Sequence, residues 1–321
     1  MKLRLIAAAL AFAALVSPAG AEQKMEQATI AQAFQSLLYL PLYVAIDKGF
    51  FKKHGVDVTK TTAGSGANGV ASVIQGSSMF SLQDPMTAAL ANLKGAKLKA
   101  VGAVVNGAPV WIVVKKESPI KTLADLQGKT IATAIPPSTS TYLLRNLMLQ
   151  KNVKPVEQTV LLGTEIAPVI AGKVDAAAVY EPYLEEAIAQ GCRILYEFSA
   201  TVPGGYAFSS IDMLESTAKT KPAVVQAFVD GLDEAIRYMN ADQGGAAEVA
   251  VTEFPSIPAE QVRAGVKRMF REKVYPKSAL IEQSAFVNAL ALQISVGNIK
   301  PNTVGYTDLI DPAFALKTGK H

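Results

Sequence analysis

Hydrophobic and polar positions alternate along the chain in two different periods, which predicts strands and helices in turn. Runs rich in β-branched and apolar residues, typical of strands, occupy the ranges 28–34, 56–61, 79–82 and 98–105. Between the first two runs, Pro41 opens a helical pattern whose apolar face runs through Gly49 and which ends at Gly55. Further helical patterns cover 67–75 and the segment that Pro85 opens. This order predicts an α/β fold with a mainly parallel sheet.

The same alternation then starts again. The second set of strand-like runs occupies 110–115, 130–134, 159–162, 176–180 and 192–196. The helical patterns of this part cover 122–127, 138–150 and 166–171. A second series of strands and helices in turn predicts a second α/β unit.

Beyond Gly204-Gly205 the pattern becomes mostly helical. Pro222 opens a long amphipathic helix, and further helical patterns cover 259–272 and 278–296. The tail has one weak strand of its own, at 206–211. We therefore expect the tail to fold back onto the first unit. The predicted domains are lobe 1, residues 22–110 with 206–321, and lobe 2, residues 111–205.

The first 21 residues have the pattern of a secretory signal peptide. Lys2 and Arg4 precede an apolar run at 5–16, and an A-x-A cleavage motif ends at Ala21. The run is too short for a transmembrane anchor, and no later segment is long and apolar enough to span a membrane. We predict cleavage after Ala21, a periplasmic location and no membrane insertion.

Composition narrows the possible functions. Of 321 residues, 50% are hydrophobic and 18% charged, which is typical of a folded chain with a large core. The net charge is +4, and +2 once the predicted signal peptide is removed, so the balance does not favour nucleic-acid binding. Two histidines and a single cysteine, Cys192, leave little for a zinc site or a Cys/His dyad. We expect Cys192 to be buried, and we expect no metal and no cofactor.

Two segments resemble each other in order and spacing. In 73–85 and again in 169–182 a helix end, a glycine, a strand and an acid–proline pair follow one another. The acids of these pairs, Asp84 and Glu181, would lie beyond the carboxyl ends of strands, where open α/β sheets bind ligands. They can cap the helices that follow, contact a ligand, or imitate a glycosidase pair. Their place before helix-opening prolines favours capping or hydrogen bonding.

Three loops carry polar groups at predicted strand ends. Residues 64–69 match G-x-G-x-x-G but follow the second strand, which favours a structural turn or a ligand-facing loop over a dinucleotide site. The hydroxyl run 138–141 can cap a helix or bind a polar ligand, with Arg145 as a surface residue or a counter-charge. Aromatic side chains near the predicted lobe edges can pack or stack on a ring; these are Tyr39, Trp111, Tyr180 and Tyr183.

The sequence resembles one family at three places. The segments are 40–58, LPLYVAIDKGFFKKHGVDV, then 118–130, SPIKTLADLQGKT, and 172–182, which opens GKVDA and closes YEP with Tyr180 where the family has tryptophan. They are similar to nitrate/sulfonate/taurine-type solute-binding proteins of ABC importers, a group that also includes binders of thiamine pyrimidine precursors and riboflavin. Eukaryotic pyrimidine-synthase relatives are enzymes, but their cysteine-rich motif and active-site histidine have no counterpart here.

The resemblance implies a hinged, two-lobed periplasmic-binding-protein fold of type II-like architecture. Such a protein, expected to be a monomer, closes on a small solute and delivers it to a membrane permease with its ATPase. The matching cleft positions are Gln35, Ser36, Tyr39, Ser65, Gly66, Asp84, Ser138, Thr139, Ser140, Tyr180 and Glu181. The expected ligand is sulfonate- or taurine-like, with a pyrimidine or another N-heterocycle as the alternative; a periplasmic enzyme is the rival class.

Overall fold

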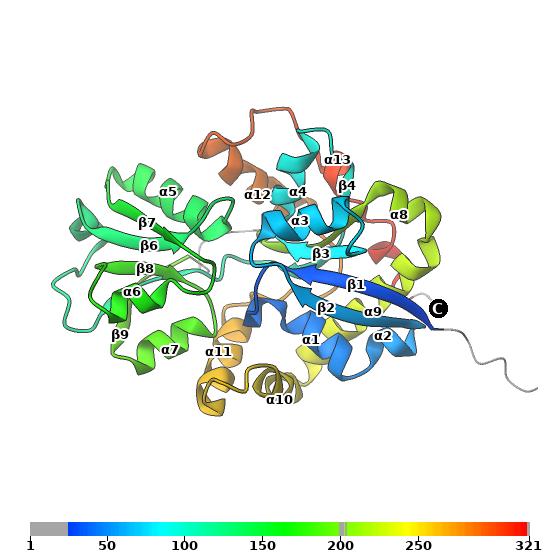
Figure 1. Ribbon diagram of the computed structural model, residues 1–321, viewed down its shortest axis with the longest axis horizontal. Helices are drawn as coiled ribbons and strands as arrows, with labels where there is room; N and C mark the ends of the chain where they lie inside the picture. Colours follow the sequence, from blue (N-terminus) through cyan, green and yellow to red (C-terminus); the bar gives the residue numbers. More distant parts are fainter. Residues whose placement is uncertain (1–24, 199–201, 203, 320–321) are drawn as a thin grey trace, which may run out of the picture.

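Two five-stranded sheets lie side by side in the computed structural model, which describes residues 25–198, 202 and 204–319 (Figure 1). The first sheet has the order β2-β1-β3-β10-β4 and contains β1 (Glu26–Gln32), β2 (Val56–Thr62), β3 (Phe80–Gln83), β4 (Leu98–Val105) and β10 (Ser209–Leu214). The second has the order β7-β6-β8-β5-β9 and contains β5 (Trp111–Lys115), β6 (Thr130–Ala134), β7 (Val156–Val160), β8 (Ala176–Val179) and β9 (Cys192–Glu197). The predicted signal peptide lies outside the described residues.

In each sheet one strand runs against the other four. The antiparallel strands are β10, between β3 and β4, and β5, between β8 and β9. Each is the first strand after the chain passes from one sheet to the other. The mainly parallel α/β fold is therefore confirmed. The strands of the sequence repeat, β3 and β8, hold the same third place in their sheets.

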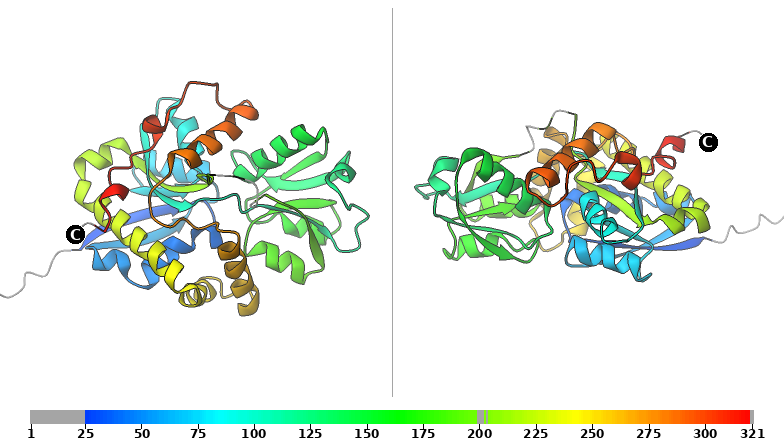
Figure 2. Two further views of the ribbon diagram at one scale, coloured as in Figure 1. Left: turned by 180° about the vertical axis from the view of Figure 1, so that it is seen from behind. Right: turned by 90° about the horizontal axis from the view of Figure 1, so that it is seen from above.

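Helices cover both sheets (Figure 2). We call the first sheet and its helices lobe 1; these are η1 (Leu37–Tyr39), α1 (Leu40–Asp47), α2 (Phe50–Lys53), α3 (Gly66–Ile74), α4 (Pro85–Asn92), α8 (Glu215–Thr220), α9 (Pro222–Ala241), α10 (Gln243–Glu253), α11 (Ala259–Arg271), α12 (Gln283–Ser295), α13 (Tyr306–Leu309) and η4 (Ala315–Lys317). Lobe 2 is the second sheet with η2 (Leu123–Leu126), α5 (Thr139–Lys151), α6 (Ile166–Ile170) and α7 (Tyr183–Ala189). The exact domain boundaries given above stay a prediction.

The helical tail packs against lobe 1 through aromatic rings. The ring of Phe228 on α9 lies 4.6 Å from that of Phe51 on α2 and 4.3 Å from that of Phe80 on β3. One turn further along α9, a Cβ on Gly231 would lie 2.7 Å from Cδ1 of Phe51. Only a glycine lets the two helices approach this closely, so a tail residue without a side chain helps to complete the lobe 1 core.

Two predicted helices are shorter in the structure than their periodicity suggests. Gly49 has a left-handed backbone (φ 71°), which ends α1 and separates it from α2. The predicted helix 278–296 begins only at Gln283, because Ala279 is held elsewhere. Its N–H donates to the Asp233 carboxylate at 2.8 Å, and its carbonyl accepts from Ala103 N at 2.8 Å. Tertiary hydrogen bonds here override helical propensity.

Smaller differences concern element ends and burial. The segment 122–127 forms the 3₁₀ turn η2, the tail strand begins at Ser209, and α10 was not predicted. Cys192 is buried in β9, as expected, and Trp111 is fully buried in β5. None of the helices in the described ranges has the length and hydropathy that a membrane span needs.

Candidate functional site

A small cavity lies between the lobes, at the carboxyl ends of β1, β3 and β8. Its volume is ≈ 40 Å³, room for about three water molecules. Lobe 1 lines it with Ala33, Phe34, Leu38, Tyr39, Gly66, Gln83, Asp84, Thr87, Phe208 and Ser209. Lobe 2 lines it with Pro137, Ser138, Thr139, Leu162 and Tyr180. The cavity is at the place where open α/β sheets bind ligands.

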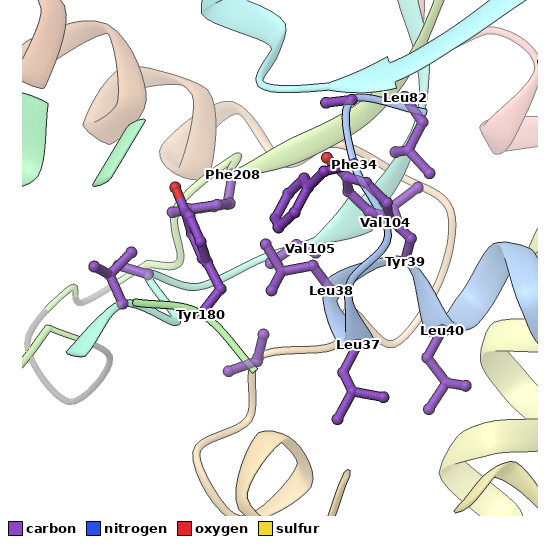
Figure 3. Packing of buried hydrophobic residues seen from close by; sticks show 14 of the residues in the cluster. Phe34, Leu37, Leu38, Tyr39, Leu40, Leu82, Val104, Val105, Tyr180 and Phe208 are labelled. Atoms are coloured by element: carbon purple, nitrogen blue, oxygen red, sulfur yellow. The ribbon is translucent and has the colours of Figure 1, made fainter. Parts of the chain in front are cut away.

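Aromatic rings form much of the cavity wall. The ring centroid of Phe34 lies 5.6 Å from that of Tyr39 and 5.3 Å from that of Tyr180. Tyr180 in turn lies 6.1 Å from Phe208. Figure 3 shows Tyr180 of lobe 2 facing Phe34 and Phe208 of lobe 1. Such a wall suits a planar or apolar group bound between the lobes.

Asp84 both caps a helix and joins the lobes. One carboxylate oxygen accepts the Met86 N–H at 2.8 Å, which caps α4. The other accepts a hydrogen bond from the hydroxyl of Thr139 in lobe 2. Burial raises the pKa of Asp84 to about 6, against the opposing effect of these two hydrogen bonds. Among the described residues that line the cavity, Asp84 is the one acidic or basic side chain of the Asp, Glu, Lys, Arg or His type.

The hydroxyl run at the start of α5 divides into two pairs. Ser138 and Thr139 line the cavity. Ser140 and Thr141 are fully buried; the Ser140 N–H donates to the Tyr180 hydroxyl at 3.1 Å, and the Thr141 hydroxyl donates to the Ala134 carbonyl at 2.6 Å. The first pair faces the cavity, where Thr139 donates to Asp84 and Ser138 Oγ lies 3.1 Å from Ser140 Oγ. The second pair fixes the loop and the Tyr180 ring.

Gln35, Ser36 and Ser65 lie beside the cavity. The Gln35 amide donates to the carbonyl and carboxylate of Glu253 at 2.8 and 3.0 Å, on the exposed side. The Ser36 hydroxyl donates across the lobes to the Glu181 carbonyl at 2.7 Å. Ser65 caps α3 by accepting the N–H of Asn68 at 3.1 Å. Ser36 is therefore an inter-lobe contact and Ser65 a helix cap, whereas the Gln35 side chain joins two parts of lobe 1.

Glu181 belongs to a cluster of three charged residues between the lobes. Its carboxylate accepts from Nε of Arg268 on α11 at 2.9 Å, and Arg268 also donates to Glu185 on α7. Glu181 is fully buried, and a Cβ on Gly265 would lie 3.0 Å from its Oε2. We call Arg268, Glu181 and Glu185 the Arg268 cluster.

Two carboxyl groups share one guanidinium in the Arg268 cluster. Burial and then the charge of Glu185 raise the pKa of Glu181 to about 8, while Arg268 opposes the shift. Burial beside the Arg268–Glu185 pair therefore favours the neutral form of Glu181. Its partners leave Glu181 facing α11 of lobe 1, away from the cavity.

Several lining residues were not predicted. Gln83 directly precedes Asp84, and Phe34 follows the first strand, so their positions gave a signal. Phe208 and Ser209 come from the second passage between the lobes, and no local pattern marks them. The other lining residues that the sequence did not predict are Ala33, Leu38, Thr87, Pro137 and Leu162. Arg145, a predicted counter-charge or surface residue, forms a double hydrogen bond with Glu157 in lobe 2 and does not line the cavity. The part of the chain that the structure describes contains no group of side chains spaced to hold a metal ion.

Comparison with known proteins assigns the chain to a family. Residues 38–246, more than half of the chain, match the family model described as NMT1/THI5 like. The chain belongs to this family. A curated relative, YtlA of Bacillus subtilis, is 19% identical over 309 residues, covering 92% of this chain and 91% of YtlA. The resemblance stated from the sequence is confirmed.

Solved structures with the same fold include a component of an import system and an alkanesulfonate-binding protein. The ligand-binding component of an ABC-type import system from Staphylococcus aureus, with zinc bound, has a TM-score of 0.79 at 13% identity, covering 92% of this chain and 100% of that one. The alkanesulfonate-binding protein SsuA from Xanthomonas axonopodis pv. citri, bound to MOPS, has a TM-score of 0.74 at 18% identity, with coverage of 90% and 99%. This chain therefore has the periplasmic-binding-protein fold.

Proposed function

We propose that this protein is the solute-binding component of an ABC importer. The observation that carries the proposal is the cavity itself, which both lobes line and beside which the Asp84–Thr139 hydrogen bond joins the lobes. A solute enclosed in this way favours closure through its contacts with both lobes. In this proposal the chain is exported, cleaved after Ala21, and acts in the periplasm as a monomer. It delivers its solute to a membrane permease and the ATPase that drives it.

The charge of the cavity bears on the choice between the two ligand classes. Asp84 lies at the wall, so a sulfonate or nitrate bound beside it would meet a like charge. A taurine-like solute could turn its ammonium group toward Asp84. A ring with N–H donors could do the same while packing against the Phe34 and Tyr180 rings that line the cavity. We therefore favour an N-heterocycle, and a taurine-like amine is the second candidate.

A calorimetric panel with the chain from Glu22 onward tests both points. The probes are 4-amino-2-methylpyrimidine, 2,4-dimethylpyrimidine, taurine, methanesulfonate and nitrate. The two pyrimidines differ only by a methyl group in place of the amine. We expect one-to-one binding of the aminopyrimidine and at least tenfold weaker binding of the dimethyl compound, because a hydrogen bond to a charged group contributes about 1.5–3 kcal/mol. Binding of methanesulfonate and nitrate alone would overturn the donor-bearing ligand.

The same samples distinguish binding from catalysis. A binding protein returns the probe chemically unchanged after prolonged incubation, with one molecule bound per chain. Conversion of the probe, followed by mass spectrometry, would instead support the periplasmic enzyme. Mass spectrometry of any solute carried through purification gives an independent identification.

A further inference from the structure

An apolar groove of ≈ 480 Å³ lies between α3 and α4, beside the cavity. Ala67, Val70 and Ile74 line it from α3, at spacings that place them on one face of the helix. Leu90 lines it from α4, Lys94 lines it from the turn after α4, and Tyr142 of lobe 2 closes the third side. Both lobes therefore shape the groove, as they shape the cavity.

The groove and the cavity meet at two shared residues. Thr87 of α4 and Pro137 of lobe 2 line both of them. From this junction the α3 face from Ala67 to Ile74 extends about 10 Å outward. The exposed Lys94 lies on the α4 side of the groove. A group that enters at the junction can thus lie along apolar side chains.

The small volume of the cavity and the exposed apolar surface of the groove both indicate that a bound molecule covers the groove. The cavity of ≈ 40 Å³ holds a small head group only, so a larger solute must extend out of it. Ile74 remains 47% exposed, and covering such apolar surface favours binding. Because the groove and the cavity share Thr87 and Pro137 in their walls, a single molecule can occupy both.

We propose that the solute carries an apolar chain, which leaves the cavity between Thr87 and Pro137 and lies along the α3–α4 groove. The inference rests on the proposed function, because the polar head of the same molecule occupies the cavity beside Asp84. The ligand class is therefore a donor-bearing ring or amine with an aliphatic or other apolar substituent. The groove selects the substituent, and the cavity selects the head.

A chain-length series tests the proposal. The probes are 4-aminopyrimidines with a methyl, butyl or hexyl chain at position 2, and a second set with the chain at position 5. For a chain that lies in the groove, we expect the dissociation constant to fall about three- to fourfold for each methylene buried. If the methyl compounds do not bind, the proposed ligand head fails. If they bind and neither set gains affinity with chain length, the groove proposal is overturned.

Two matched variants locate the chain. Ile74→Gln places an amide in the groove, whereas Leu93→Gln changes a side chain of similar exposure, 48% against 47%, that does not line it. We expect Ile74→Gln to weaken hexyl binding at least fivefold, leave methyl binding unchanged, and leave the thermal midpoint near that of Leu93→Gln. Equal effects of the two variants on the hexyl compound would overturn the placement of the chain.

Discussion

Replacing Arg268 with methionine tests how the two lobes hold together. Arg268 lies on α11 of lobe 1, with its side chain 15% exposed, and it donates to the fully buried Glu181 and to Glu185 of lobe 2. Arg268→Met keeps the length and apolar stem of the side chain but removes the guanidinium. The loss of their shared partner destabilises the two carboxyl groups only when the lobes are closed, because separation of the lobes returns these groups to water.

The expected magnitude follows from the contacts. Two hydrogen bonds to a charged group contribute about 1.5–3 kcal/mol each, and breaking a buried ion pair costs about 3–5 kcal/mol. A shift of about 3 kcal/mol changes the ratio of closed to open protein about 150-fold. We therefore expect Arg268→Met to raise the radius of gyration in small-angle X-ray scattering. Solute affinity should fall by up to the same factor, because binding must then provide the closure energy.

Arg263→Met is the matched control on the same helix. Arg263 pairs with Glu248 on the surface, where the two side chains are 48% and 60% exposed, and we expect a change within about 1 kcal/mol. The double variant Arg268→Met with Glu181→Gln should lose little more solute affinity than Arg268→Met alone, because the two changes remove the same interaction. Equal radii of gyration and equal affinities for the Arg268→Met and Arg263→Met proteins would refute the reasoning.

Three further changes test other parts of the structure. Burial raises the pKa of Glu165 from 4.5 to about 7. The free energy of unfolding of the wild type should therefore fall by about 3 kcal/mol as the pH rises through this range. Urea unfolding of Glu165→Gln should lack this loss. Thr139→Val removes a hydroxyl that donates to the Asp84 carboxylate, so carboxyl NMR should show the pKa of Asp84 rising above about 6; an unchanged value would contradict the bond. Gly231→Ala forces a Cβ to 2.7 Å from a ring carbon of α2 and should cost about 1–3 kcal/mol. Gly244→Ala meets nothing closer than 3.6 Å, so thermal unfolding should show little change or a gain of up to about 1 kcal/mol.

Local patterns were sufficient for most of the architecture. Strand and helix periods depend on neighbours a few residues apart, so the alternation in both lobes could be read directly. The acid–proline pairs at Asp84 and Glu181 marked the ends of the equivalent strands β3 and β8. The helix break at Gly49 was missed because glycine is also compatible with a helix, and only its left-handed backbone decides the matter.

The candidate site was only partly predictable. Tyr39, Asp84 and Thr139 follow strand ends or open helices, and the structure brings them to the cavity. Phe208 lines the same cavity but comes from the returning chain, far away in sequence. Glu181 has the same local signature as Asp84, yet the two side chains face different surroundings.

The sequence by itself determined the α/β alternation, the two lobes and the carboxyl-end loops that could meet in a cleft. These features depend on periodicity and on glycine, proline and capping residues, whose effects are local. Only the tertiary structure decided which equivalent acid faces the cavity. Asp84 lies beside Thr139 in the cleft, whereas α11 brings Arg268 and Gly265 against Glu181 and encloses it. The physical reason is that a carboxylate takes its charge state and its role from neighbours that are distant in the chain, and a local motif does not specify those neighbours.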